Sequence, residues 1–405
     1  MSEAIAQSIP DRRRGRAILG TCGGAHFLHD GLSDALYVLL PLWAEAFGLS
    51  LAQVGALKTI YSGAMASFQL PAGFLSERLG ERRLLVVGTF AAGIAYGLIA
   101  VVDGYLALAL LLLLAGLGSG VQHPLASALV ARAYEAGGRR SALGTYNFTG
   151  DLGKMAAAGA AGLVVAVVGW QGTTAGFGLI AVAVGLALLF ALHKLGAGAP
   201  PAPRTGAEQP IDRRDWGIRN VLGFRAISAI GIIDSAVRYG FLTFVPFLLV
   251  EKGARIEAVG LAMALIFGGG AVGKLACGLL AERMGVIRTA IATELATALA
   301  IGVLPFLPLT WAMALLPLAG IALNGTSSVL YGTVADFVDY QRQSRAYGLF
   351  YTLGIGSGAA APTIVGVLSD AHGVTVAMFA LAAAALATLP ACAVLSSAIK
   401  RGSAP

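Results

Sequence analysis

The chain has 405 residues, of which 57% are hydrophobic and only 12% are charged. A soluble domain carries about a quarter charged residues, so this composition excludes an ordinary soluble protein and indicates an integral membrane protein. The net charge of +7 does not indicate a nucleic-acid partner, because the basic residues gather in loops on one side of the predicted spans.

Apolar runs long enough to cross a bilayer as helices, which takes about 20 residues each, follow one another along the whole chain. They are residues 17–47, 52–76, 83–102, 105–131, 141–168, 172–193, 217–250, 257–281, 287–308, 311–335, 344–368 and 373–399. The polar segment 196–215, rich in proline, separates the sixth run from the seventh and is predicted to be a flexible linker. We therefore expect an all-α membrane protein of twelve transmembrane helices, with an N-terminal bundle at 1–195 and a C-terminal bundle at 216–405.

The distribution of basic residues predicts the topology. Most of the 28 Lys and Arg residues lie in segments on the side of the N-terminus, whereas the opposite loops contain only Lys252 and Arg255. Loops rich in Lys and Arg stay in the cytoplasm. We expect a multi-pass protein of the inner membrane with both termini and the linker in the cytoplasm.

An internal repeat supports the division into two halves. Residues 73–80 (Gly-Phe-Leu-Ser-Glu-Arg-Leu-Gly) and 278–285 (Gly-Leu-Leu-Ala-Glu-Arg-Met-Gly) lie 205 residues apart. At an offset of 204, Asp30 in the first span corresponds to Asp234 in the seventh. Self-similarity at half the chain length predicts two pseudo-symmetric bundles.

Residues 73–83 resemble the signature Gly-x-Leu-x-Asp-Arg-x-Gly-Arg-Arg of the major facilitator superfamily, with Glu77 in place of the aspartate. Segments 26–30, 118–124 and 144–153 resemble its fosmidomycin-resistance branch. The resemblance implies the major facilitator fold, in which spans one, four, seven and ten line a central cavity and transport proceeds by alternating access. Within the third segment and just beyond it the chain departs from that branch, so an anionic metabolite fits as well as a drug. The departing residues are Asp151, Lys154 and Ala158.

The signature loop also implies a gate. Two glycines allow a tight cytoplasmic turn, the acidic and basic residues between them can pair across the gate, and in the superfamily this loop stabilises the state closed to the cytoplasm. The predicted gating residues are Gly73, Glu77, Arg78, Gly80, Glu282 and Arg283.

Ionisable residues in the first span point to a wetted pathway. His26, Asp30 and Asp34 are successive i, i+4 neighbours and share one helix face. Ionisable groups in hydrocarbon cost about 2.5–3.5 kcal/mol each, so they usually face water. The alternative is a polar helix face buried against its neighbours.

If the four cavity-lining spans meet as the resemblance implies, Asp30 and Asp34 are the first candidates for proton coupling, assisted by His26 and His123. Guanidinium groups offer fork-shaped donors to a substrate carboxylate. The predicted substrate-binding residues are Arg225, Arg238, Lys58, Asp234, Asp151, Lys154, Tyr37, Tyr61, Tyr146 and Tyr239.

The charges inside the spans are nearly balanced, which indicates buried pairing. Asp151 and Lys154 are i, i+3, and Asp234 and Arg238 are i, i+4, so each pair can instead neutralise itself locally. Glu294 in the ninth span belongs to the same set of intramembrane charges.

The spacing His26-x-x-His29-Asp30, with His123 as a further nitrogen, also matches metal ligands, although His29 points away from the His26/Asp30 face. No phosphate-binding loop, nucleophile elbow or zinc-protease motif occurs, so we expect neither an enzyme nor a cofactor. We predict a monomeric proton-coupled secondary transporter that exports a small organic anion or antimicrobial. The alternatives are a proton-coupled importer of a carboxylate nutrient and a metal-binding membrane protein using residues 26–30.

Overall fold

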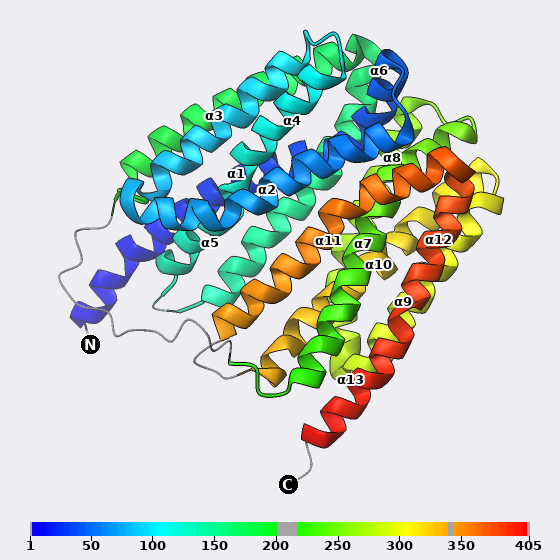
Figure 1. Ribbon diagram of the computed structural model, residues 1–405. Helices are drawn as coiled ribbons and strands as arrows, with labels where there is room; N and C mark the ends of the chain where they lie inside the picture. The colour runs from blue at the N-terminus through cyan, green and yellow to red at the C-terminus, as the bar shows by residue number, and fades with distance from the viewer. Residues whose placement is uncertain (1, 136, 201–216, 339–342, 403–405) are drawn as a thin grey trace. The chain divides into compact units, whose positions relative to one another are not determined.

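A computed structural model describes residues 2–135, 137–200, 217–338 and 343–402, and Figure 1 shows their arrangement. The described residues are helical apart from short connections. The helices are α1 (Ser2–Phe47), α2 (Leu51–Leu79), α3 (Glu81–Ile99), α4 (Tyr105–Gly120), α5 (Gln122–Ala133), α6 (Arg139–Lys194), α7 (Val221–Glu251), α8 (Ile256–Met284), α9 (Val286–Val303), α10 (Leu309–Val334), α11 (Gln343–His372), α12 (Val374–Leu386) and α13 (Thr388–Gly402), with 3-10 turns at Leu304–Phe306 and Ala335–Phe337. The predicted linker 196–215 lies outside the described residues from 201 onward.

Each predicted apolar run lies in one helix or in two consecutive helical segments. Nine helical segments within the described ranges are long and apolar enough to cross a membrane. The 56-residue helix α6 contains two of the predicted spans. They are separated by a kink at Gly169, whose φ of 70° and ψ of 174° are not helical. The fold is therefore the predicted all-helical one, although the α4/α5 and α12/α13 breaks were not predicted.

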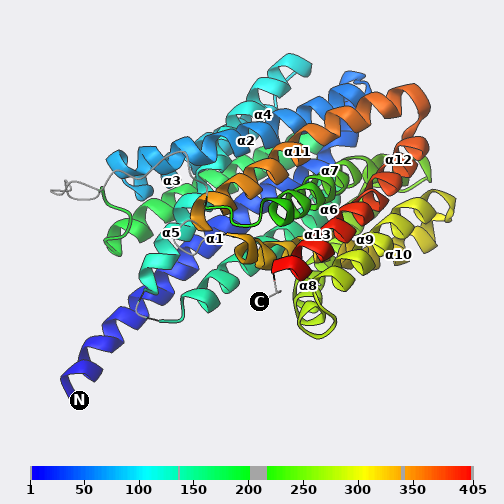
Figure 2. The ribbon, with the colours of Figure 1, turned by 60° about the horizontal axis from the view of Figure 1, so that its bottom comes forward.

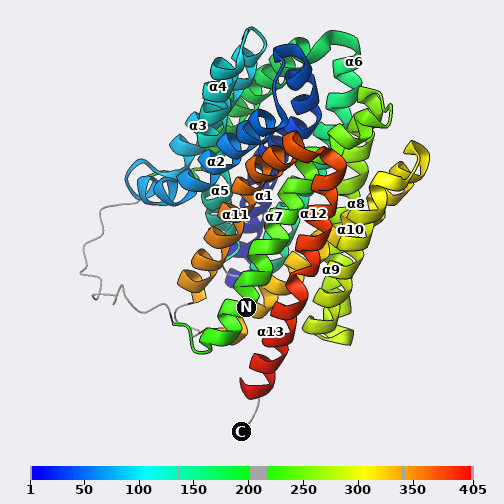
Figure 3. The same cartoon turned by 45° about the vertical axis from the view of Figure 1, so that its right-hand side comes forward.

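The chain divides by its contacts into two compact units, one formed by residues 1–42 and 60–205 and the other by residues 43–59 and 206–405. In the first unit α3 runs alongside α6 (Figure 2), and Gly93 and Gly178 let their backbones approach closely. In the second unit α7 lies between α11 and α12 (Figure 3).

The start of α2 belongs to the second unit. The Asp370 carboxylate, near the end of α11, accepts hydrogen bonds from the backbone N–H groups of Leu51 and Ala52 at 2.8 and 2.9 Å. A carboxylate at a helix N-terminus satisfies free N–H groups and is favoured by the helix dipole. Asp370 thus fixes the beginning of α2 onto α11.

Glycines with positive φ recur in the same order along the two halves. Such angles are open to glycine and strained for other residues. The pairs, 205, 205 and 204 residues apart, are Gly48 (φ 61°) with Gly253 (φ 85°), Gly80 (φ 79°) with Gly285 (φ 86°), and Gly169 (φ 70°) with Gly373 (φ 86°). The repeat seen in the sequence is therefore also a repeat of helix junctions.

One glycine prediction is wrong. Gly73 was expected in the tight turn of the signature loop, but it lies inside α2, which continues to Leu79. Only Gly80 makes the turn, as the single residue between α2 and α3. Because a glycine inside a helix costs only about 1 kcal/mol relative to alanine, its presence in the signature did not mark the helix end.

Candidate functional site

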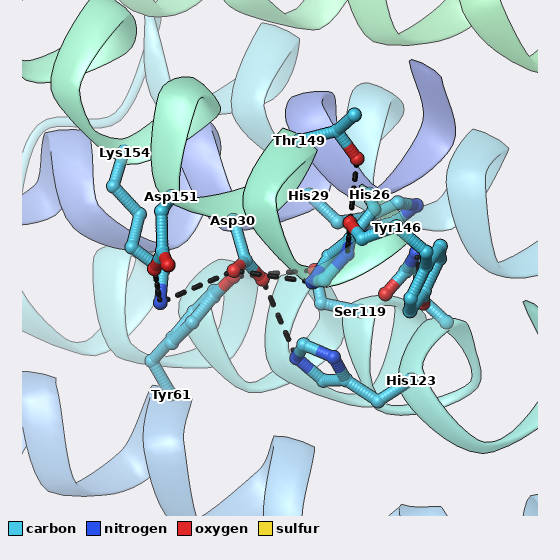
Figure 4. Close-up of polar contacts among 11 residues, drawn as sticks. His26, His29, Asp30, Tyr61, Ser119, His123, Tyr146, Thr149, Asp151 and Lys154 are labelled. Carbon is cyan, nitrogen blue, oxygen red and sulfur yellow. Dashed lines mark hydrogen bonds and ion pairs between the residues drawn. The ribbon is translucent and has the colours of Figure 1, made fainter. Parts of the chain in front are cut away.

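A buried carboxylate, Asp30, lies at the centre of a group of nitrogen atoms in the first unit (Figure 4). Its side chain is 9% exposed. Oδ2 lies 3.2 Å from His26 Nε2 and 3.2 Å from Lys154 Nζ, and Oδ1 lies 3.4 Å from His123 Nε2. Three helices, α1, α5 and α6, contribute these four side chains.

Glycines let α6 come close enough to α1 to form this group. A Cβ atom at Gly150 would lie 2.6 Å from His26 Nε2 and 2.7 Å from Asp30 Oδ2. One turn further along α6, a Cβ atom at Gly153 would collide with the backbone of Phe27. Gly150 and Gly153 therefore leave room on α6 for the polar face of α1.

The partners of His26 show that a proton is held between His26 and Asp30. His26 Nδ1 lies 2.9 Å from the Tyr146 carbonyl oxygen, which only accepts, so Nδ1 carries a hydrogen. If Nε2 carried none, its lone pair would face the Asp30 carboxylate at 3.2 Å, which is repulsive. The pair therefore contains one proton more than a neutral imidazole and a carboxylate. The His26 ring is also held by stacking on Tyr146, with ring centroids 4.2 Å apart.

Lys154 bridges two carboxylates. Its Nζ lies 3.6 Å from Asp151 Oδ1 as well as 3.2 Å from Asp30 Oδ2. The predicted local pair with Asp151 is present, and the contact with Asp30 adds a tertiary partner that the spacing did not indicate. Two carboxylates, one ammonium and the proton shared with His26 leave the group neutral, as expected for charges buried in a membrane.

His29 has a structural role on the other face of α1. The Thr89 hydroxyl donates to the Leu85 carbonyl at 2.7 Å and so accepts from His29 Nε2 at 2.9 Å. Nδ1 then accepts from Ser119 at 3.1 Å. Both nitrogens of a neutral imidazole are satisfied.

This geometry gives little support to the alternative of a metal site at residues 26–30. His29 does not join Asp30, although ligand atoms of His26, Asp30 and His123 do lie within 4.8 Å of one another. The Lys154 ammonium already contacts the same carboxylate, and it repels a second cation there.

The other predicted residues of the N-terminal bundle differ in burial and in partners. Tyr61 is buried and its hydroxyl donates to Ser119 at 3.2 Å, while Tyr37 and Lys58 are each 1% exposed. Asp34 is partly exposed. Tyr146, besides stacking on His26, accepts from Gln122 Nε2 at 3.0 Å.

The predicted residues of the seventh span lie in the second unit. Asp234 is buried, and the partly buried Arg238 interacts electrostatically with it. Arg238 reaches Ser327 at 3.4 Å, and its guanidinium lies 5.8 Å from the centre of the Tyr239 ring. Arg225 is exposed near the start of α7.

The predicted gating side chains Glu77, Arg78, Glu282 and Arg283 are all exposed. The ion pair at this end of the first unit joins Glu81, the residue after Gly80, to Arg132 at the end of α5 at 2.7 Å. The sequence did not predict this pair, because its two residues are 51 positions apart and lie on different helices.

The sequence pattern of the Major Facilitator Superfamily matches residues 22–230 and again residues 227–403. The chain belongs to this superfamily. It is a multi-pass membrane transporter rather than an enzyme.

Individual relatives are distant but cover most of the chain. "Probable sulfoacetate transporter SauU" of Cupriavidus necator is 26% identical, with 83% of each chain covered. The "Hexuronate transporter" of Bacillus subtilis is 24% identical, with 86% of each chain covered. Among solved structures, a bacterial homologue of the human lysosomal transporter Spinster has a TM-score of 0.74 at 17% identity, covering 96% of this chain and 98% of its own, which shows the shared fold.

Proposed function

We propose that this facilitator takes up a small organic carboxylate together with a proton, with Asp30 and His26 holding the proton and Lys154 binding the anion. The observation that carries the proposal is the contact of the Lys154 ammonium with the buried Asp30 carboxylate, at 3.2 Å. The same carboxylate shares a proton with His26, so one side chain connects the proton site to the cation.

The arrangement couples the two ligands by competition. An anionic substrate that reaches Lys154 competes with Asp30 and Asp151 for the ammonium. Movement of the shared proton from His26 onto Asp30 removes one competitor, so the anion binds better to the protein that holds the proton, and by linkage the proton binds better when the anion is present.

Competition of this kind favours cotransport over exchange. Because proton and anion are bound at the same time, an inward proton gradient drives uptake. Export was predicted from the sequence, with a proton-coupled importer of a carboxylate nutrient as an alternative. The Lys154 contact supports the importer.

The relatives support the substrate class. Sulfoacetate and hexuronates, which two of them are named for, are small carboxylates that an ammonium and hydroxyl-bearing side chains can bind. The drug substrate of the fosmidomycin-resistance branch receives less support, because Asp151 and Lys154 are departures from that branch and both belong to the charged group.

The test is uptake of labelled carboxylates by the purified protein in proteoliposomes, with sulfoacetate and a hexuronate as first probes. We expect an acidic exterior to accelerate uptake. Asp30→Asn should lower the rate of gradient-driven uptake to about a tenth of the wild-type rate or less. A tenfold loss of rate corresponds to about 1.4 kcal/mol in activation free energy. It should retain exchange of labelled for unlabelled substrate, because a neutral side chain imitates protonated Asp30.

Glu257→Gln, which removes a carboxylate paired with exposed Arg255, serves as the control and should behave as wild type. The proposal would be contradicted if the rate of wild-type uptake did not depend on the pH gradient. It would also be contradicted if the gradient accelerated uptake by the Asp30→Asn protein as much as by the wild type.

A further inference from the structure

Glu294 is a second buried acid, in the unit that does not contain Asp30. It lies on the membrane-spanning helix α9 and is 1% exposed. The hydroxyls of Thr326 on α10 and Thr388 on α13 are within hydrogen-bonding reach of its carboxyl group. Its Oε1 atom has no hydrogen-bond partner among the described residues.

Both threonine hydroxyls have other acceptors for their single hydrogen. Thr388 donates to the Ala385 carbonyl at 2.6 Å. Thr326 makes a 2.7 Å hydroxyl contact with Thr293, whose own hydrogen can go to the backbone carbonyl of Thr289 or of Ala290, both at 3.0 Å. A hydroxyl has one hydrogen and two lone pairs. Thr326 and Thr388 can therefore each accept a hydrogen bond from Glu294 while their hydrogens stay on these acceptors.

The protonated acid fits these surroundings better than the carboxylate does. A carboxylate has no hydrogen to donate, and its buried Oε1 would be left without a donor. An ionised group buried without donors or a close cation costs several kcal/mol. The protonated side chain avoids this cost by donating its O–H to one of the threonines.

Few charged or titratable groups lie on the helices near Glu294. Asp234 and Arg238 on α7 interact with it electrostatically, and the Cys392 thiol on α13 lies close to it. Of the other helices packed against α9, α8 carries Lys274 and Cys277 inside its span, and α10 and α12 contain no Asp, Glu, Lys or Arg. With Glu294 neutral, Asp234 and Arg238 balance each other.

The repeat places a neutral residue at the position equivalent to Glu294. At the offset of 205 residues that relates the helix junctions, Glu294 corresponds to Thr89 of α3. Thr89 is a neutral side chain that binds His29 inside the first unit. The carboxyl group in α9 is therefore a departure from the pseudo-symmetry.

We propose that Glu294 is a second proton-binding residue of this transporter, protonated in the conformation described and ionised during another part of the transport cycle. Its ionisation would change the charge of the Asp234, Arg238 and Glu294 cluster from zero to minus one. The inference goes beyond the proposed role of Asp30, since it concerns a different group in the other unit.

Infrared spectroscopy of the purified protein at neutral pH tests the protonation state. Glu294→Gln should lose one band in the C=O stretching region of protonated carboxylic acids. The amide fits, because its NH2 group can donate to the threonine lone pairs as the acid does. Glu294→Asp, which keeps the acid but moves it, should shift the band and remains informative if the glutamine variant folds poorly. Glu257→Gln should leave the band in place, and an unchanged band in both Glu294 variants overturns the proposal.

The number of protons moved per substrate in proteoliposomes tests the role in transport. Glu294→Gln should move one proton fewer than wild type, and an unchanged ratio would overturn the transport role. If wild-type uptake proves to be independent of protons, the function proposed for Asp30 fails, whereas the infrared band still decides whether Glu294 holds a proton.

Discussion

In the proposed mechanism, the partners of Lys154 decide whether an anion can bind. Its ammonium contacts Asp30 and Asp151, and the side chain is 28% exposed, so it is reachable from water. Such a cation can exchange one carboxylate partner for another at little net cost, because the number of charge-assisted hydrogen bonds stays the same.

Lys154→Gln should therefore weaken substrate binding more than folding. We expect the KM for a carboxylate to rise about tenfold or more, since a hydrogen bond to a charged group contributes about 1.5–3 kcal/mol. Initial rates of uptake against substrate concentration measure it. Lys194→Gln, at the exposed end of α6, is the matched control. Equal KM values in the two variants would remove Lys154 from the binding site.

Contacts between near neighbours in sequence could be predicted at this scale, and contacts between distant residues could not. The spacings of His26 with Asp30 and of Asp151 with Lys154 place each pair on one helix face, and both pairs are present. The contact of Asp30 with Lys154 joins residues 124 positions apart. It depends on how α6 packs on α1, which helical periodicity does not encode.

At the scale of helices, the site depends on the close approach of α6 to α1. Gly150 makes that approach possible because its missing side chain leaves room for His26 and Asp30. The sequence showed the glycines of segment 144–153, but not which of them faces α1. Gly144, six residues earlier on the same helix, faces open space.

Gly150→Ala should disturb the site, whereas Gly144→Ala should not. The added methyl would lie 2.6–2.7 Å from His26 and Asp30, and overpacking of this kind costs about 1–3 kcal/mol. We expect a lower thermal stability in detergent and weaker stimulation of uptake by a proton gradient. Wild-type behaviour of Gly150→Ala would show that α6 can move away from α1 without affecting coupling.

At the scale of the whole molecule, the two halves repeat their helix junctions more faithfully than their charges. The positive-φ glycines recur at offsets of 204 and 205 residues, and Asp30 recurs as Asp234. Yet Asp151 and Lys154 have no counterpart pair at these offsets, where Ile355 or Gly356 and Gly358 or Ala359 stand at the equivalent positions. The repeat could be predicted from the sequence because the positive φ angles of these turns require glycine at the turn itself.

Two pairs of glycines, each 205 residues apart, allow the effect of backbone conformation on stability to be measured separately from the effect of helix packing. Gly80 and Gly285 have φ of 79° and 86° with ψ near 150°, a region that costs other residues about 1–3 kcal/mol. Gly73 and Gly278 are helical and face open space. Gly80→Ala and Gly285→Ala should each lower thermal stability in detergent, whereas Gly73→Ala and Gly278→Ala should leave it equal or slightly higher, because alanine favours helices by up to about 1 kcal/mol. Gly80→Ala should be the more damaging of the first two, since its methyl would lie 2.7 Å from the Gly198 carbonyl and the Gly285 methyl would meet nothing within 4 Å. Equal losses in all four variants would mean that packing in the membrane, and not the junction geometry, preserves the glycines of the repeat.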